Sequence, residues 1–167
     1  MSSEAARFEA VLSRHRPSIA RLCRHHEASA EARRDLEQEI LVALWRALAT
    51  FRGDCAEKTF VLRVAHNVAV THVARSARAR SLDALTVADP STSPAAPPDQ
   101  AFDHRAEIAR IERRLRAMDL ASQQLVLLAL EGCTTGEIAE VTGLTPTNVT
   151  TRLSRLRQAL AQEQEEP

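Results

Sequence analysis

The chain has 167 residues, of which 44% are hydrophobic and 26% are charged. Its 22 basic and 22 acidic residues give a formal net charge of zero, which is low for a DNA-binding protein, although the basic residues are almost all Arg and are locally clustered. This composition is typical of a soluble globular chain of one or two small domains, and no segment is long and apolar enough to span a membrane. The N-terminus lacks the apolar core of a signal peptide, and the three cysteines are widely spaced, so we expect a cytoplasmic protein.

Two short amphipathic segments, 8–16 and 18–26, begin the chain and are interrupted by Pro17. Proline disrupts the interior of a helix but is tolerated at its start. We therefore expect two consecutive helices or one kinked helix here.

The next segment, "DLEQEILVALWRALATF", predicts the core helix of the N-terminal half. Asp35 and Gln38 have the spacing of a capping box, which places the start of this helix at Asp35. One apolar stripe consists of Leu36, Ile40, Leu44, Leu48 and Phe51. The residues away from this stripe include Asp35, Gln38, Glu39, Val42, Trp45 and Arg46. An exposed Trp beside charges is typical of an interface, and the alternative is that Trp45 packs against the first helices.

A turn at Arg52, Gly53 and Asp54 precedes a long predicted helix over 58–80, and Asp54 and Glu57 have the spacing of another capping box. The apolar side of this helix consists of Phe60, Val61, Val64, Ala65 and Val68. The polar residues that lie largely elsewhere are Arg63, His66, Asn67, Thr71, Arg75 and Arg78. Such a polar and basic track suits a nucleic-acid strand, and the alternative is a solvated Arg-rich helix end.

The stretch over 82–102 is rich in Pro, Ala, Ser and Thr and has no helical period, which indicates a linker. A segment of this length without structure of its own is normal between domains and unusual within one. On both sides of it, helical periodicity is common and strand-like alternation is absent. We therefore predict an all-α fold with two small helical domains, 1–81 and 105–167, joined by a flexible linker over 82–104.

The C-terminal segment "TTGEIAEVTGLTPTNVTTRLSRLRQAL" predicts two short helices with a turn between them. Thr134 and Glu137 form a capping box, Gly143 ends the first helix, and Thr145 with Pro146 begins the second. The second helix has an apolar stripe and, turned away from it, Thr147, Asn148, Thr150, Thr151, Arg152 and Arg155. A helix of this kind fits the DNA major groove, where its first residues meet base edges and arginines such as Arg152, Arg155 and Arg157 neutralise phosphates. An ordinary helical hairpin with solvated arginines is the alternative.

In this order, the segments resemble an extracytoplasmic-function (ECF) sigma factor of bacterial RNA polymerase over nearly the whole chain. "DLEQEILVALWRAL" resembles the region-two helix that binds the clamp helices of the largest polymerase subunit. "FRGDCAEKTFVLRVAHNVAVTHVARSARAR" resembles the segment that opens the minus-ten element, and "LVLLALEGCTTGEIAEVTGLTPTNVTTRLSRLRQAL" resembles region four, which reads the minus-thirty-five element.

The resemblance implies roles for three groups of residues. Those expected to face core polymerase are Asp35, Gln38, Glu39, Val42, Trp45 and Arg46. Those expected to meet minus-ten DNA are Arg52, Gly53, Asp54, Arg63, His66, Asn67, Thr71, Arg75 and Arg78, with Asn67 helping to capture a flipped base. Those expected to meet the minus-thirty-five duplex are Thr147, Asn148, Thr150, Thr151, Arg152 and Arg155. The sequence departs from the family pattern at Glu57, Phe60, Thr71, Thr147 and Asn148.

The resemblance also implies partners: the clamp helices and the flap of core polymerase, promoter DNA as duplex and melted single strand, and an anti-sigma factor that holds the protein at the inner membrane. It implies no cofactor and no small-molecule substrate, and no signature of a catalytic site is present in the sequence. Cys23 and His26 lie one helical turn apart without a suitably spaced fourth metal ligand, and Cys55 near a helix start is a candidate oxidant sensor. Two other functions remain open, namely a freestanding helix-turn-helix regulator and a sigma-like interaction module without promoter activity.

Overall fold

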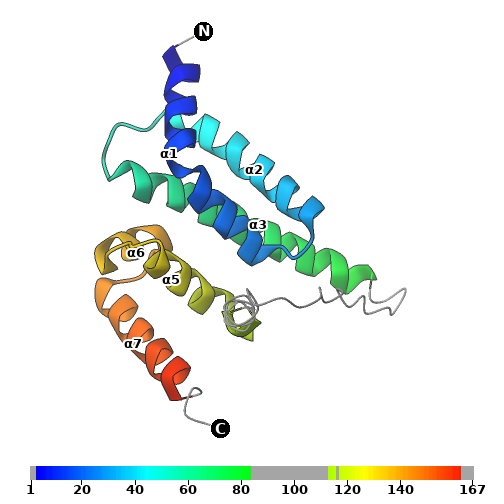
Figure 1. The fold of residues 1–167 in the computed structure, drawn as a ribbon, viewed down its shortest axis with the longest axis vertical. Helices are drawn as coiled ribbons and strands as arrows, with labels where there is room; N and C mark the ends of the chain where they lie inside the picture. The colour runs from blue at the N-terminus through cyan, green and yellow to red at the C-terminus, as the bar shows by residue number, and fades with distance from the viewer. Residues whose placement is uncertain (1–2, 84–112, 116, 163–167) are drawn as a thin grey trace, which may run out of the picture.

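The computed structural model describes residues 3–83, 113–115 and 117–162, which form an all-α fold without strands in these ranges (Figure 1). The helices are α1 (Ser3–His26), α2 (Ala30–Leu48), α3 (Glu57–Asp83), α5 (Leu120–Leu130), α6 (Thr135–Thr142) and α7 (Pro146–Gln162). The all-α prediction is confirmed. Residues 84–104 of the predicted linker lie outside the described residues, and residues 82 and 83 belong to α3.

Of the two alternatives predicted around Pro17, two consecutive helices is wrong, because α1 is one helix of 24 residues with Pro17 inside it. An internal proline costs a helix about 3 kcal/mol. Val11 on one side of Pro17, and Ile19 and Leu22 on the other, are all buried against α2 and α3. Packing along the whole length of α1 therefore outweighs the local cost, and Pro17 itself is exposed.

The predicted start of the second helix is also wrong, because α2 begins at Ala30 and Asp35 lies inside it. The N-cap is Ser29, whose hydroxyl accepts a hydrogen bond from the backbone N–H of Ala32 at 3.0 Å. The extra turn carries no residue of the apolar stripe, so periodicity did not reveal it. The capping box predicted from Asp54 and Glu57 is not formed either, since the Glu57 carboxylate is bound by Arg14 and His15 of α1.

The helices α1, α2 and α3 enclose one hydrophobic core. The predicted stripe of α2 is confirmed, because Leu36, Ile40, Leu44 and Leu48 are all buried in this core. Phe60 of α3 is buried at the same place, and its ring stacks on that of Phe51 with centroids 4.2 Å apart. The exposed polar residues of α2 and α3 are thereby held at fixed positions on the outside of a packed three-helix unit.

The pair α6 and α7 forms as predicted from its capping signals. The Thr134 hydroxyl accepts from the Glu137 backbone N–H, and the Glu137 carboxylate accepts from the Thr134 backbone N–H at 2.7 Å. Gly143 ends α6 with φ of 73°, a left-handed conformation that glycine adopts at little cost. The Thr145 hydroxyl then accepts from the Asn148 backbone N–H at 3.3 Å, which caps the start of α7.

Replacing Thr134 with Ala should lower the free energy of unfolding of the C-terminal helices by about 1 kcal/mol, because the α6 N-cap is lost. Thr135→Ala is the matched control, since Thr135 is exposed and lies one residue further on. Urea denaturation followed by circular dichroism measures both variants. Equal loss in the two variants would contradict the assignment of Thr134 as the cap.

Candidate functional site

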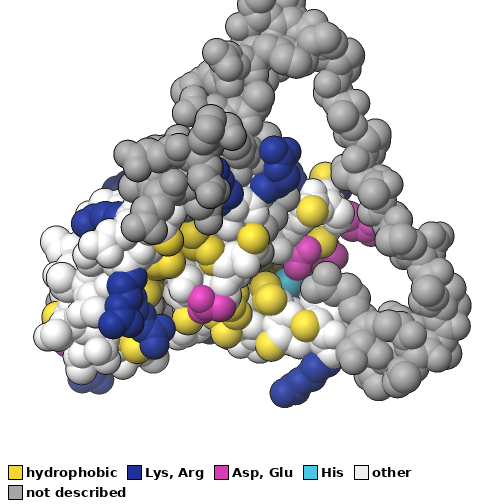
Figure 2. All heavy atoms as spheres, turned by 90° about the horizontal axis from the view of Figure 1, so that it is seen from below, with side chains coloured by type: hydrophobic (Ala, Val, Ile, Leu, Met, Phe, Trp, Pro, Cys, Tyr) yellow, Lys and Arg dark blue, Asp and Glu magenta, His cyan; other side chains and the backbone are white. Residues whose placement is uncertain are grey.

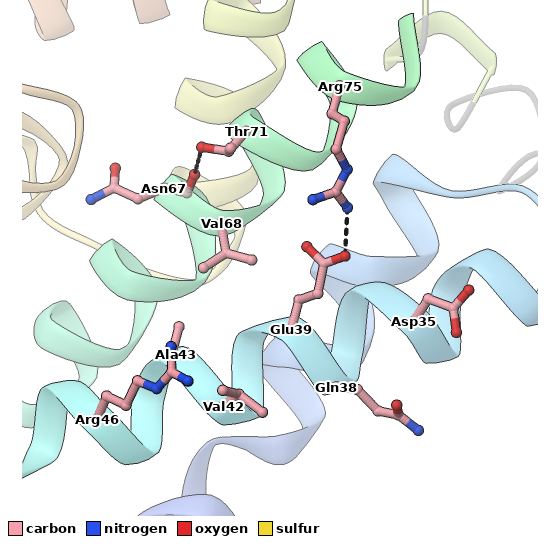
Figure 3. Close-up of a pocket in the computed structure, with 10 residues that line it drawn as sticks. All are labelled: Asp35, Gln38, Glu39, Val42, Ala43, Arg46, Asn67, Val68, Thr71 and Arg75. Atoms are coloured by element: carbon pink, nitrogen blue, oxygen red, sulfur yellow. Dashed lines mark hydrogen bonds and ion pairs between the residues drawn. The ribbon is translucent and has the colours of Figure 1, made fainter. Parts of the chain in front are cut away.

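A groove of about 860 Å³ runs between α2 and α3 and joins two groups of residues for which the sequence predicts different partners (Figure 3). The residues predicted to face polymerase that line it are Asp35, Gln38, Glu39, Val42 and Arg46 of α2. The residues predicted to meet DNA that line it are Asn67, Thr71 and Arg75 of α3. Ala43 and Val68 complete the lining, so the surface is mixed polar and apolar.

An ion pair crosses the groove from α2 to α3. The Glu39 and Arg75 side chains point toward one another in Figure 3, with Arg75 Nη2 2.5 Å from Glu39 Oε1. His72 lies beneath them, buried, with Nδ1 3.2 Å from Arg75 Nη2 and Nε2 3.0 Å from Glu27 Oε1. These distances fit an Nε2–H that donates to Glu27 and an Nδ1 that accepts from Arg75. The Arg75 guanidinium is thus already engaged by a carboxylate within the protein.

Asn67 and Thr71 lie one turn apart on the exposed side of α3. The Thr71 hydroxyl donates to the backbone carbonyl of Asn67 at 2.9 Å, so it is occupied by its own helix. The Asn67 side chain is exposed and keeps an amide, with both donor and acceptor atoms, at the edge of the groove.

The other predicted site residues of the N-terminal half lie outside the lining of this groove. Arg52, Gly53 and Asp54 are exposed in the turn between α2 and α3, and Arg78 is exposed near the end of α3. Arg63 is half-buried, with its guanidinium carbon 5.8 Å from the centroid of the Phe60 ring.

Trp45 packs against the first helix, as one of the two alternatives predicted, and its interface role stays a prediction. Its ring packs edge-to-face against Phe8 of α1, with centroids 5.2 Å apart. It nevertheless remains 44% exposed, and Val42, one turn away, is 50% exposed. The two residues leave an apolar patch on the outer face of α2, next to the groove.

The helix α7 presents the predicted reading face to solvent. Val149 and Leu153 are buried against α5 and α6, as the apolar stripe predicted. All the predicted DNA contacts are exposed: Thr147, Asn148, Thr150, Thr151, Arg152 and Arg155. The Thr150 hydroxyl donates to the backbone carbonyl of Pro146 at 3.0 Å. Figure 2, seen from below relative to Figure 1, shows Lys and Arg side chains around exposed hydrophobic ones at the lower end of the molecule.

Metal and thiol chemistry find little support in the described part of the chain. There, no three His, Cys, Asp or Glu side chains are arranged to hold a metal ion. Burial raises the pKa of the Cys23 thiol to about 12, so this cysteine is an unreactive thiol at neutral pH. Cys55 is half-buried, and its predicted role as an oxidant sensor stays a prediction.

Similarity to known proteins decides the family. Residues 11–79 match the family model of Sigma-70 region 2, and residues 108–160 match that of Sigma-70 region 4. This chain is a member of the sigma-70 family, of the ECF type. It is 27% identical to the RNA polymerase sigma factor CnrH of Cupriavidus metallidurans and 26% identical to the RNA polymerase sigma factor NccH of Alcaligenes xylosoxydans xylosoxydans. Each match covers 92% of this chain and 84% of the relative.

The fold of this sigma factor also matches that of a solved relative. The structure of CnrH in complex with the cytosolic domain of CnrY superposes with a TM-score of 0.67 at 22% identity. The match covers 95% of this chain and 89% of that chain. By the family matches, the α1–α3 unit is region two and the α5–α7 unit is region four. Within the described ranges, no helix combines the length and apolarity needed to cross a membrane.

Region four of the sigma factor packs against region two, below α1 and α3 in Figure 1. Glu131, directly after α5, is the centre of the polar contact. Its carboxylate accepts from Arg21 Nε at 2.6 Å, from Arg21 Nη2 at 2.8 Å and from the Ser18 hydroxyl at 2.6 Å. Its backbone carbonyl accepts from the Lys58 ammonium, and the hydrogen bonds to its carboxylate, that of Arg21 first, lower the pKa of the Glu131 carboxyl. Glu131 is therefore ionised at neutral pH and joins α1, α3 and α5.

The apolar part of the contact is made by Leu62 of α3. Leu62 is 1% exposed and packs in the hydrophobic cluster of region four with Leu125, Leu128 and Ile138. Beside it, the Thr59 hydroxyl donates to Glu137 at 3.0 Å. The sigma factor thus has a closed arrangement in which one side of α3 is covered by region four.

His66 lies one turn beyond Leu62 and is 2% exposed, with Nδ1 buried and without a hydrogen-bond partner. Burial, followed by the nearby His26 and His25, lowers the pKa of this imidazole to about 3. In this arrangement His66 is buried and not available to DNA, so the structure does not present it for the predicted contact. Neither Leu62 nor Glu131 was predicted from the sequence to make a contact of this kind. One sequence feature could have predicted the contact of Leu62: the apolar residues of α3 lie on more than one side of the helix, which indicates a second buried face.

Proposed function

We propose that this sigma factor binds core RNA polymerase, directs it to promoters with two upstream elements and helps to melt them. The observation that carries this proposal is the groove between α2 and α3, because it places the predicted polymerase-facing and strand-binding residues on one continuous surface. Binding of polymerase to α2 then brings the melted strand to α3.

The outer face of α2 has the composition of a protein interface. Trp45 and Val42 supply an exposed apolar patch, and exposed Asp35 and Gln38 with half-buried Glu39 supply a polar rim. We infer that this face binds the clamp helices of the largest polymerase subunit. Region four would bind the flap of the second-largest subunit.

Asn67 is the residue we propose to contact an unstacked base of the minus-ten non-template strand. Its exposed amide offers both a donor and an acceptor to a base edge. Extruding a base costs a few kcal/mol of lost stacking, so a side chain that binds only the extruded base favours the melted state. Arg78 is exposed on the same helix and would contact the strand backbone, as would Arg75 once it leaves Glu39.

The exposed face of α7 is proposed to bind the minus-thirty-five duplex. Thr147 and Asn148 lie in the first turn of α7, where a recognition helix meets base edges. Arg152 and Arg155 would neutralise phosphates and give an affinity that falls as salt rises.

The closed arrangement suggests how this activity is controlled. CnrH, which shares this fold, has been solved with the cytosolic domain of CnrY. We propose that a comparable anti-sigma factor binds this chain, keeps region four on region two and retains the protein in the cytoplasm next to the inner membrane. Since region four covers Leu62 in the closed state, release has to precede any contact of this side of α3 with DNA.

The proposal is tested by transcription in vitro with core polymerase, this protein and a pooled library of genomic promoters from the source organism, followed by sequencing of transcript starts. We expect new starts that share a two-part upstream motif. Asn67→Ala should reduce open-complex formation at least tenfold, because the variant loses the amide that binds the extruded base. A tenfold loss corresponds to about 1.4 kcal/mol. Permanganate footprinting of melted thymines measures this loss directly.

Ser13→Ala, which truncates an exposed polar residue of α1, is the control and should leave transcription unchanged. Two results would contradict the proposal in different ways. Tight duplex binding without polymerase and no new starts would indicate the freestanding regulator. Neither activity would indicate a sigma-like interaction module.

A further inference from the structure

The turn between α2 and α3 is held at its first end by Arg7 of α1. Arg7 Nη1 donates to the backbone carbonyl of Leu48 at 3.4 Å, and Nη2 donates to that of Phe51 at 3.1 Å. Leu48 is the last residue of α2, so Arg7 binds one carbonyl of the helix end and one carbonyl of the turn that follows it. The Arg7 guanidinium also lies 5.7 Å from the centroid of the Phe51 ring.

The second end of the turn is held by Glu57, the first residue of α3. Its two carboxylate oxygens accept from Arg14 Nε at 2.9 Å and from Arg14 Nη2 at 2.8 Å. His15 Nε2 lies 2.8 Å from Glu57 Oε1. The bidentate geometry fixes both the direction and the distance of the contact, and the hydrogen bonds from Arg14 hold the pKa of the Glu57 carboxyl below its usual range. Glu57 is therefore engaged by α1.

Between these two ends the apex of the turn stays exposed. Arg52, Gly53 and Asp54 are all exposed, and Gly53 has φ of 84°, which favours glycine. Phe51, just before the apex, is stacked on Phe60 of the core. The apex is therefore a short exposed segment whose two ends are both fixed to α1, while its own side chains are free of the core.

We propose that Arg7, Arg14 and Glu57 are positioning residues that set the place of the 52–54 apex relative to α3, and thereby the nucleotide preference at the minus-ten strand. This inference rests on the proposed function. A segment that is ordered before binding loses less conformational entropy when it meets its ligand than a mobile one does. Loosening either end of the turn would therefore weaken and broaden recognition of the melted strand without changing the outer face of α2.

The test uses the full chain with core polymerase and compares Glu57→Gln, Arg14→Met and the double variant. Because Arg14 is largely exposed, the pair is of modest strength, and we expect a three- to tenfold loss of open complexes in each single variant. The preference for the favoured minus-ten nucleotides should also fall. A library of randomised minus-ten elements measures this preference. Affinity for core polymerase should stay unchanged. The double variant should lose no more than Glu57→Gln alone, because the contact that Arg14→Met removes is already altered in Glu57→Gln.

Glu37→Gln is the matched control, since Glu37 pairs with Arg16 at 3.5 Å and joins α1 to α2 away from the turn. It should leave both the open complexes and the nucleotide preference as in the wild type. Unchanged nucleotide preference in Glu57→Gln and Arg14→Met, with an active wild type, would overturn the positioning role and leave the proposed function standing. A loss of open complexes in the double variant that equals the product of the two single-variant losses would also overturn the positioning role. An inactive wild type would overturn both.

Discussion

Replacing Leu62 with Glu should separate region four from region two. Leu62 is 1% exposed among Leu125, Leu128 and Ile138, so the substitution would place a carboxylate in an apolar cluster. Burying an unpaired charge costs several kcal/mol, whereas separation of the two regions returns the carboxylate to water. Leu62 faces region four and not the core of region two, so region two should remain folded.

Two measurements report this separation. The radius of gyration from small-angle X-ray scattering should increase, and the sedimentation coefficient should fall, because the separated regions are less compact. Leu130→Glu is the matched control, since Leu130 is 71% exposed at the end of α5. A Leu62→Glu variant with the radius of gyration and the sedimentation coefficient of the wild type would show that the two regions are not held together by this contact.

Acidification from pH 7 to pH 5 should lower the stability of region two by about 4 kcal/mol at most. Burial lowers the pKa of His66 to about 3 and that of His26 to about 4, whereas an unfolded histidine has a pKa of about 6.5. Between these values the unfolded chain binds more protons than the folded one, so acid favours unfolding. The stability is fully present above about pH 6.5 and is lost as pH falls toward the folded-state values. Each histidine contributes about 2 kcal/mol of this loss at pH 5.

The thermal unfolding midpoint across this pH range measures the effect. The carboxyl groups of Glu57 and Glu131, whose pKa values are lowered by their arginine partners, lose stability only below their ordinary pKa of 4.5, so they do not contribute in this window. His66→Gln should flatten the pH dependence by about half, because glutamine does not titrate. His26→Gln added to it should remove most of the remainder. A His66→Gln variant with the wild-type slope would show that another group titrates.

The features predicted correctly from sequence are those whose causes lie within a few residues. Thr134, Glu137 and Gly143 define α6 through contacts that span less than ten residues, and all of them form. The stripe of α2 from Leu36 to Leu48 is likewise a local pattern that the core then buries. The family resemblance, carried by the order of such segments, is confirmed for the same reason.

The errors in helix boundaries arise where packing outweighs a local signal. Pro17 interrupts the sequence pattern, but buried residues on both sides keep α1 continuous. Asp35 has the spacing of a cap, yet α2 extends back to Ser29 because the intervening residues are good helix formers and Arg33 binds the carbonyls of Glu27 and Ala28.

The contacts between distant segments could not be predicted, because helical periodicity shows that a face is buried but not which segment covers it. Leu62 packs against region four, and Glu57 binds Arg14, which lies 43 residues earlier. His66 was assigned to the polar track of α3 for the same reason, although it is buried. The predicted roles in polymerase and DNA binding remain predictions, which transcription and footprinting with the variants test.

The pairing of Arg75 with Glu39 has a consequence for how binding to the melted strand depends on ionic strength. An arginine that is free in solution carries no fixed counterion, and its contact with a phosphate releases a cation condensed on the nucleic acid. Arg75 already has the Glu39 carboxylate 2.5 Å away. A phosphate that binds Arg75 therefore displaces this carboxylate and leaves its negative charge unpaired beside the strand. Glu39 then retains or attracts a cation, which offsets the one that the phosphate released. The plot of log affinity against log salt concentration should therefore become steeper by roughly 0.7 in Glu39→Gln, the contribution of one phosphate on a single strand.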